Sequence, residues 1–273
     1  MRADRSEARG VTASSAKQPI AGIHMVQKAD RKPKALVLGV GAERGIGGGV
    51  SALFAKNGHH VLVAGRTADK IGKVVEAIRR AGGSASPVTV DGTKEDEVIR
   101  LFDKAMADDA DGTPADLFVF NMGNNAAVDI REMTAQHFED SWRVGCFAGF
   151  LFGREAMRRL VPLGRGTVIF TGASGSMRGR PRFAAFNATK GGLRLMVQSM
   201  AREFGPQGIH VAHVIIDGGI EGDRLLSRMP DRAEKARAEY LRAQKADPRS
   251  PAPVFNLGIL YLESQLSDVA NGE

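Results

Sequence analysis

Residues 35–47 read ALVLGVGAERGIG, and the rest of the architecture can be worked out from this stretch. Its first four residues form a short, continuous apolar run, as expected for a strand buried on both faces of a sheet. Glycines follow, and a helical pattern then extends to Lys56. Small residues between a strand and a helix let the backbone approach a pyrophosphate, which the free N–H groups of the first helical turn attract. The stretch predicts a dinucleotide site with contacts from Gly41, Gly45, Ile46 and Gly47. The alternative is a tight turn that binds no ligand.

Short apolar strands and helical patterns alternate along the chain after this turn. Strands are predicted at 35–38, 60–64, 86–90, 116–120, 166–171 and 210–216. Helices are predicted at 46–56, 68–81, 95–106, 134–159 and 188–204. Such alternation predicts an α/β fold with a doubly wound parallel sheet, in three layers and a single domain.

The two ends of the chain differ from this core, which we place at residues 35–222. Residues 1–34 carry eight Lys or Arg and three Asp or Glu, so +5 of the formal net charge of +7 lies there. We expect these residues to form a disordered basic extension. The remaining chain shows no basic face that would bind nucleic acid. In the segment 223–273 we expect a lid-like helix at 231–246 and an atypical ending with a last strand at 254–262.

Composition excludes several classes of site and partner. Cys146 is the only cysteine, so an intramolecular disulfide and a cysteine-rich metal site are both excluded. No run of 18 apolar residues is present, so we expect no membrane span. His59 and His60 have no third metal ligand nearby, and we expect His210 and His213 to be structural histidines with satisfied hydrogen bonds. The sequence favours a cytoplasmic protein that acts on a small molecule, without a metal.

The end of the second predicted strand indicates which dinucleotide is bound. NAD sites usually place Asp or Glu there, to accept hydrogen bonds from the ribose 2′-hydroxyl. This chain has Gly65 and Arg66 instead, and Arg44 adds a second cation within the glycine turn. Two guanidinium groups suit a 2′-phosphate. We therefore expect NADP rather than NAD, the alternative being two solvated surface arginines.

From about residue 34 to residue 222, the chain resembles the short-chain dehydrogenase/reductase family, which has a Rossmann-type fold. The glycine turn is similar to the family's TGxxxGxG motif, with Val40 in place of Thr. Asn121 keeps the first position of an NNAG segment, and Lys190 keeps the lysine of a YxxxK motif. Further cofactor contacts are expected from Asp91, Gly92, Asn121, Met122, Gly123, Lys190, Gly218 and Ile220.

The catalytic positions implied by this resemblance are mostly altered. In the family, a tyrosine exchanges the substrate proton, and the lysine lowers its pKa and holds the nicotinamide ribose. Phe186 stands at the tyrosine position and Ala173 at the position of a serine that orients the substrate, with Ser174 adjacent. Gly145 stands where an asparagine supports a proton relay. The remaining catalytic candidates are Lys190 and Ser174, although Ser174 also suits a turn.

Two functions follow from this pattern. The first is an NADP-dependent oxidoreductase that transfers hydride to or from a small organic substrate, with a non-standard proton donor. The second is a non-catalytic NADP-binding sensor or a subunit of a complex. Helices near 147–160 and 188–204 match those that pair subunits in the family, so the resemblance implies a homodimer or homotetramer.

Overall fold

A six-stranded parallel sheet forms the centre of the computed structural model, which describes residues 31–216. The strands are β1 (Pro33–Leu38), β2 (His60–Gly65), β3 (Ser84–Thr89), β4 (Thr113–Phe120), β5 (Gly166–Ala173) and β6 (Ile209–Ile216). Their order across the sheet is β3-β2-β1-β4-β5-β6, and all neighbouring pairs are parallel. The chain therefore winds outward from β1 in one direction and from β4 in the other. This confirms the doubly wound α/β prediction.

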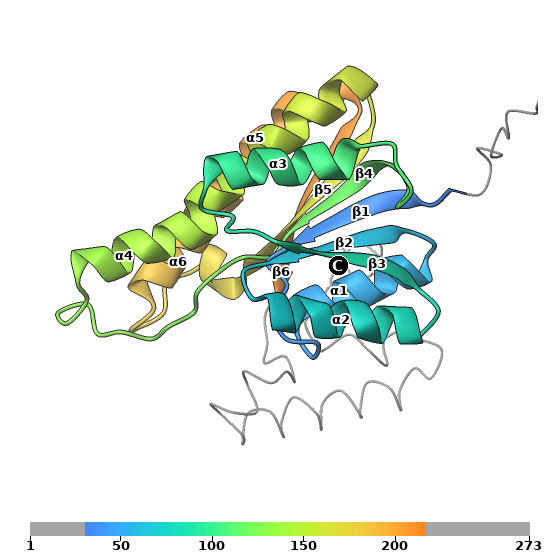
Figure 1. Cartoon of the computed structure of the whole chain (residues 1–273). Coiled ribbons are helices and arrows are strands. Elements are labelled where there is room, and N and C mark those ends of the chain that lie inside the picture. The colour runs from blue at the N-terminus through green and yellow to red at the C-terminus, as the bar shows by residue number, and fades with distance from the viewer. Residues whose placement is uncertain (1–30, 217–273) are drawn as a thin grey trace, which may run out of the picture. The chain divides into compact units, whose positions relative to one another are not determined.

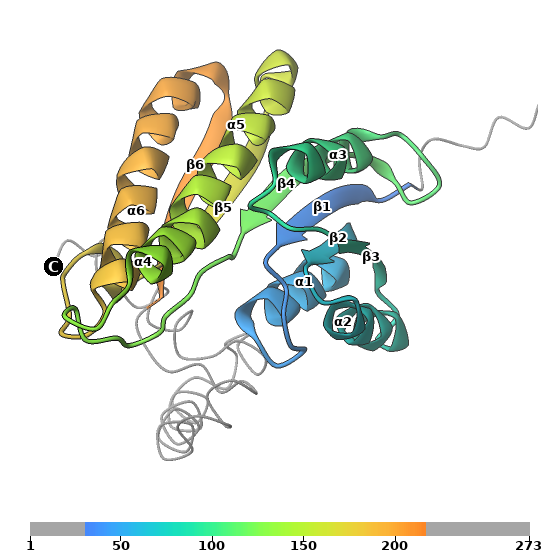
Figure 2. The same cartoon turned by 60° about the vertical axis from the view of Figure 1, so that its left-hand side comes forward.

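Helices cover both faces of the sheet (Figures 1 and 2). One face carries α1 (Ile46–Lys56) and α2 (Ala68–Arg80), and the other carries α3 (Glu95–Met106), α5 (Ala148–Leu160) and α6 (Ala184–Phe204). A shorter helix, α4 (Ala135–Trp142), precedes α5. Three layers result, as the sequence predicts.

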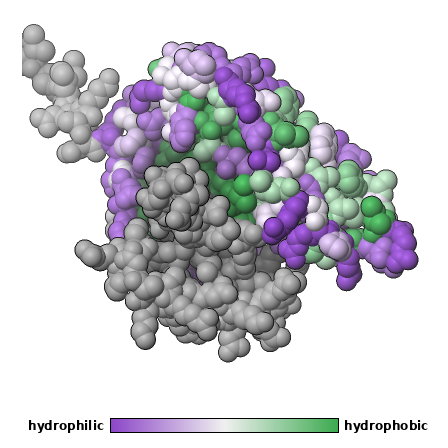
Figure 3. Space-filling view, turned by 180° about the vertical axis from the view of Figure 1, so that it is seen from behind, coloured by the Kyte–Doolittle hydropathy of each residue, from purple (hydrophilic) through white to green (hydrophobic). Residues whose placement is uncertain are grey.

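The continuous apolar run of β1 is explained by these two helical layers. Alternate side chains of a strand point to opposite faces. Leu36 and Leu38 enter the core beneath α3 and α5, while Ala35 and Val37 enter the core beneath α1 and α2. Both faces are buried, so both sets must be apolar. On the outside, hydrophilic side chains cover much of the described surface, with hydrophobic surface between them (Figure 3).

The first strand begins earlier than predicted. β1 starts at Pro33, and Lys34 is buried within it, so the predicted extension over 1–34 ran too far into the core. The Lys34 ammonium donates to the carbonyl of Ala107 and pairs with Asp109. Residues 1–30 lie outside the described part of the chain.

The helix predicted at 134–159 is divided in the structure. A π-helical segment, Arg143–Phe147, separates α4 from α5. The helix predicted at 188–204 begins four residues earlier, at Ala184. Single π turns are rare and often occur at functional sites. Gly145, within the π segment, stands at a position that the family resemblance made catalytic.

Several expectations fall on residues that the structure does not describe. The lid-like helix at 231–246, the strand at 254–262, Gly218 and Ile220 all lie beyond Ile216, the last described residue. Within residues 31–216, no helix is both long enough and apolar enough to cross a bilayer.

Candidate active site

The glycine turn leaves the carboxyl end of β1 and leads into α1. Gly39 adopts a left-handed φ of 96°, and its N–H and that of Val40 both donate to the carbonyl of Ala64, each at 3.0 Å. Gly45 precedes α1 in an extended conformation, without a side-chain cap and with no acidic residue in the first helical turn. The first N–H groups of α1 are therefore not capped by a side chain, which is the arrangement that binds phosphate at helix N-termini.

The glycines around this turn have different surroundings. A Cβ added to Gly41 would meet nothing within 4 Å, so that side of the turn is open. A Cβ on Gly47 would lie 3.0 Å from the Cα of Val40, so α1 approaches the turn closely. A Cβ on Gly65 would overlap the carbonyl oxygen of Val40. The end of β2 therefore has no room for the carboxylate that an NAD site usually places there.

Arg66 and Asp91 lie near each other beyond the ends of β2 and β3. Burial alone would raise the pKa of Asp91, but hydrogen bonds from the Thr93 N–H (3.0 Å) and hydroxyl (2.7 Å) hold that pKa below its usual value, and the charge of Arg66 adds to the effect. Arg66 itself is exposed. A Cβ on Gly92 would lie 2.5 Å from the sulfur of Met122, so Gly92 packs against the segment after β4.

Asn121 joins three strands at the carboxyl edge of the sheet. Its backbone N–H donates to Leu38, and its side-chain amide donates to the carbonyl of Gly39 at 3.1 Å. Its side-chain oxygen accepts from the hydroxyl of Thr171 at 3.0 Å. Asn121 therefore fastens the glycine turn to β4 and β5, and its amide is engaged by the protein.

Lys190 is brought from α6 to the same edge. Its side chain is buried, and its Nζ donates to the carbonyls of Met122 at 3.0 Å and Thr171 at 2.8 Å. A Cβ on Gly123 would lie 3.2 Å from Nζ, so Gly123 lies against the ammonium. Burial lowers the pKa of Lys190 to about 8. The structure thus brings together Lys190, Asn121 and the glycine turn, which are far apart in the sequence.

The segment after β5 carries Ser174 and faces Phe186. The carbonyl of Ser174 accepts the N–H groups of Met177 and Arg178 in a short 3₁₀ turn, as the turn interpretation expects. A Cβ on Gly175 would lie 2.9 Å from the ring of Phe186. The aromatic ring at this position thus packs against the turn, and it carries no titratable proton.

Gly145, at the position of the family's asparagine, has no room for a larger side chain. A Cβ on Gly145 would overlap the methyl group of Thr189, which precedes Lys190 in α6. Because even one added carbon does not fit, an asparagine side chain has no room there.

His213 is a polar residue of the site that the sequence analysis did not assign. It was expected to be a satisfied structural histidine, but among residues 31–216 its buried Nε2 has no hydrogen-bond partner. Burial lowers the pKa of His213 to about 4, and the positive charges of Lys190 and Arg194 contribute. The available signal was a histidine inside the apolar strand that follows α6.

Comparisons with known proteins agree with this geometry. Residues 35–228 match the family model for short chain dehydrogenases. Gluconate 5-dehydrogenase of Gluconobacter oxydans (strain 621H) is 29% identical over 177 residues, which cover 65% of this chain and 68% of that protein. A 1-cyclohexenylcarbonyl-CoA reductase of Streptomyces collinus is 30% identical over 203 residues, 74% of this chain and 70% of that protein.

A solved structure gives the same result. The short-chain dehydrogenase from Rhodopseudomonas palustris superimposes with a TM-score of 0.62 at 36% sequence identity, covering 77% of this chain and 91% of that one. The region matched by the family model contains most of β1, the glycine turn, Asn121 and Lys190. The chain belongs to the short-chain dehydrogenase family of NAD(P)-dependent oxidoreductases.

Proposed function

We propose that this chain is an NADP(H)-dependent oxidoreductase that transfers hydride to or from a small organic molecule, with a proton source other than residue 186. The observation that carries the proposal is the meeting of the glycine turn, Asn121 and Lys190 at the carboxyl edge of the sheet. Ligands of open α/β sheets bind at this edge, where the strand order reverses. Between β1 and β4, the order reverses at this point.

The residues present suit a dinucleotide. The start of α1 offers backbone N–H groups to a pyrophosphate, and the open side of Gly41 leaves room for it. Lys190 has three N–H donors, of which the backbone engages two, so one remains for a ribose hydroxyl. When bound, the cofactor would supply the hydride chemistry. Lys190 and the α1 terminus would bind and orient it.

The choice of NADP over NAD rests on the end of β2. Gly65 cannot carry a side chain there, and the exposed Arg66 follows directly. A guanidinium can contact a phosphate through two N–H groups at once. Arg66 already lies near the carboxylate of Asp91, and Arg44 is in the adjoining turn. We infer that these arginines select the 2′-phosphate.

The selectivity can be tested with a matched pair of variants. Arg66→Ala should reduce the ratio of NADPH to NADH affinity by about 10-fold or more, because a charge-assisted hydrogen bond contributes about 1.5–3 kcal/mol. Arg80→Ala removes an equally exposed arginine from the last turn of α2 and should leave the ratio unchanged. Calorimetric titration measures both affinities. A ratio that stays the same in Arg66→Ala would refute the 2′-phosphate assignment.

Phe186 supports a second candidate function, a non-catalytic NADP-binding sensor or subunit. Its ring packs against Gly175 and the ring of Phe183, and it has no proton to exchange. The two functions separate when NADPH oxidation is followed with a panel of carbonyl compounds and activated alkenes. Turnover by the native chain supports the oxidoreductase. Tight NADPH binding without turnover, with activity only in Phe186→Tyr combined with Ala173→Ser, supports the sensor.

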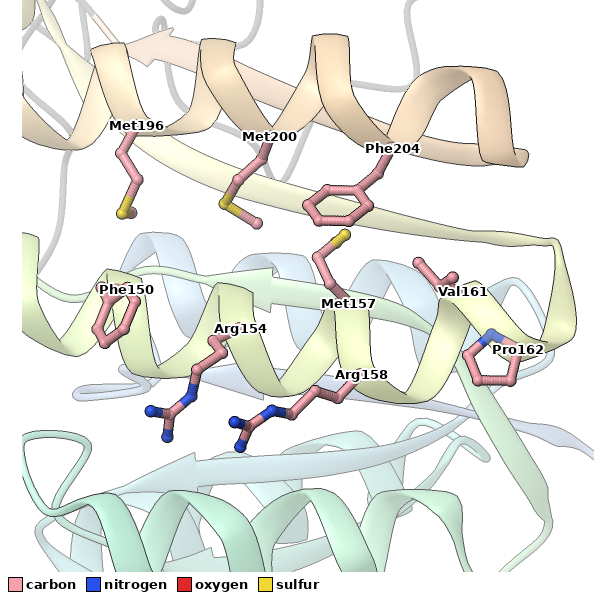
Figure 4. A pocket seen from close by; sticks show the side chains of 9 residues that line it. All are labelled: Phe150, Arg154, Met157, Arg158, Val161, Pro162, Met196, Met200 and Phe204. Carbon is pink, nitrogen blue, oxygen red and sulfur yellow. The ribbon is translucent and has the colours of Figure 1, made fainter.

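We propose further that two copies of the chain pair through an apolar groove between α5 and α6 (Figure 4). Met196, Met200 and Phe204 line it from α6, with Phe150 and Met157 from α5. Phe150, in the first turn of α5, is 43% exposed. Exposed apolar grooves of this kind mark interaction sites. Sedimentation of the native chain should give a dimer or tetramer, and Met200→Glu should shift it toward the monomer. A monomeric native chain would contradict the pairing.

A further inference from the structure

An unpaired polar atom of His213 lies near Lys190. Among the described residues, three buried side-chain atoms have no hydrogen-bond partner: His59 Nδ1, Asn187 Oδ1 and His213 Nε2. Asn187 precedes Lys190 by three residues in α6, so both lie on one face of that helix. Buried polar groups are almost always paired, and an unpaired one costs about 1–3 kcal/mol. The unpaired atom of His213, beside a proposed ligand-binding lysine, calls for a physical explanation.

His213 and Lys190 meet at a single peptide group of β5. Lys190 Nζ donates to the carbonyl of Thr171 at 2.8 Å. The next residue is Gly172, and a Cβ added there would overlap Cε1 and Nε2 of His213 and lie 3.0 Å from its Nδ1. The imidazole therefore occupies the space that a side chain at position 172 would take. The ammonium is bonded to one end of the Thr171–Gly172 peptide, and the imidazole covers the other.

Burial and neighbouring charges determine the protonation of His213 and Lys190. His213 is lowered in pKa to about 4 by burial, with Lys190 and Arg194 of α6 adding positive charge, so it is neutral at pH 7. Within the described part of the chain, no acidic residue contributes to this shift. A neutral imidazole has one acceptor nitrogen and one N–H. Lys190, with a pKa of about 8, is mostly protonated at pH 7. A donor and an acceptor therefore face the same peptide.

One N–H of Lys190 and the Nε2 of His213 are left without a hydrogen-bond partner among the described residues. An ammonium has three N–H donors, and Met122 and Thr171 accept two of them. His213 Nε2 receives none. A buried water accepts from one group, donates to another and typically makes about three hydrogen bonds.

We propose that His213 is a positioning residue for Lys190, joined to the third N–H of the ammonium through a buried water in the cofactor-free protein. The imidazole would keep Lys190 oriented before a ribose hydroxyl takes over that N–H. Such preorganisation lowers the entropic cost of binding. The inference rests on the proposed function only in treating Lys190 as a cofactor-binding group.

The titration of Lys190 in the cofactor-free, full-length chain tests this proposal. NMR of lysine labelled at Cε follows it, and the signal is assigned by its absence in Lys190→Met. His213→Leu removes the acceptor, which favours the charged lysine, so the ratio of charged to neutral Lys190 at pH 8 should fall by about 10-fold. His213→Asn keeps an acceptor and should restore most of the native ratio. His210→Leu, at an exposed position of the same strand, should have no effect.

Two results would overturn the proposal. One is an unchanged Lys190 titration in His213→Leu, and the other is a His213→Asn variant that behaves like the leucine variant, which would indicate packing alone. If His213→Leu fails to fold, NMR of ¹⁵N-histidine in the native chain decides instead. We expect His213 at pH 7 to be neutral with an unprotonated Nε2, and a protonated Nε2 would contradict the proposal. None of these measurements needs cofactor or turnover, so the proposed function can fail without affecting them.

Discussion

Two buried lysines lie at opposite ends of the sheet and have different surroundings. Lys34 is near the amino end of β1, with no exposed side-chain surface, and its Nζ reaches Asp109 Oδ1 at 2.7 Å and the carbonyls of Ala107 and Lys104 at 2.9 and 3.4 Å. Lys190 is at the carboxyl end of β5, and among the residues that the structure describes it is engaged only by the carbonyls of Met122 and Thr171. The first has three acceptors for three donors, and the second has two.

This difference distinguishes a structural charge from one placed for a ligand. Burying a cation is costly unless it is fully paired. At Lys34, the pairing is complete and ties β1 to the loop after α3. At Lys190 it is incomplete, and a histidine beside it is also unpaired. We infer that the amino end of the sheet serves stability and the carboxyl end serves binding.

Loss of the Lys190 ammonium should have the largest effect on binding. Lys190→Met should weaken NADPH affinity by about 10–100-fold, because one charge-assisted hydrogen bond contributes about 1.5–3 kcal/mol. Calorimetric titration at pH 7 measures the loss. Equal affinities in the variant and the native chain would remove Lys190 from the cofactor site.

The same substitution at Lys34 should lower stability and leave NADPH binding unchanged. Lys34→Met should lower the free energy of unfolding by about 2 kcal/mol, since it leaves buried carbonyls unpaired. NADPH affinity should stay within about twofold of the native value, because the two lysines lie at opposite ends of the sheet and share no partners among the described residues. Urea denaturation checks the first expectation. A lower NADPH affinity at unchanged stability would contradict the structural role assigned to Lys34.

A smaller effect is expected from pH. The pKa of Lys190 is lowered to about 8 by burial, from an ordinary value of 10.5. NADPH affinity should therefore fall as pH rises through 8, where the ammonium is lost, by at most about tenfold per pH unit. The contribution of Lys190 to folding stability has the opposite sign: between pH 8 and 10.5 the unfolded chain binds more protons, so stability rises. An equally steep fall in Lys190→Met would assign the pH dependence to another group.

The fold and the cofactor-binding edge could be predicted because their signals are local. The apolar run at 35–38, the glycine turn and the strand alternation each lie within a few consecutive residues. Asn121 and Lys190 were identified by their motifs, and the structure brings them to one edge. The burial of Lys34 was missed because a lysine near a basic tail gives no local sign of its partners, which lie in the 104–109 region.

The surroundings of Gly145 and His213 depend on contacts between segments that are distant in the sequence. The closed space at Gly145, within the π segment, arises from packing against Thr189 of another helix. The unpaired state of His213 depends on the register of β6 against β5 and on Gly172, forty-one positions before it. Periodicity cannot reveal such contacts, because it reports only which face of its own element a residue occupies.

The central claim is that the carboxyl end of the sheet binds NADP, and its most direct test is titration of the native chain with NADPH and NADH at pH 7. We predict one site per chain, with NADPH bound at least about tenfold more tightly than NADH, the margin that one arginine–phosphate contact provides. Absence of binding by either dinucleotide, or equal affinity for both, would contradict the account.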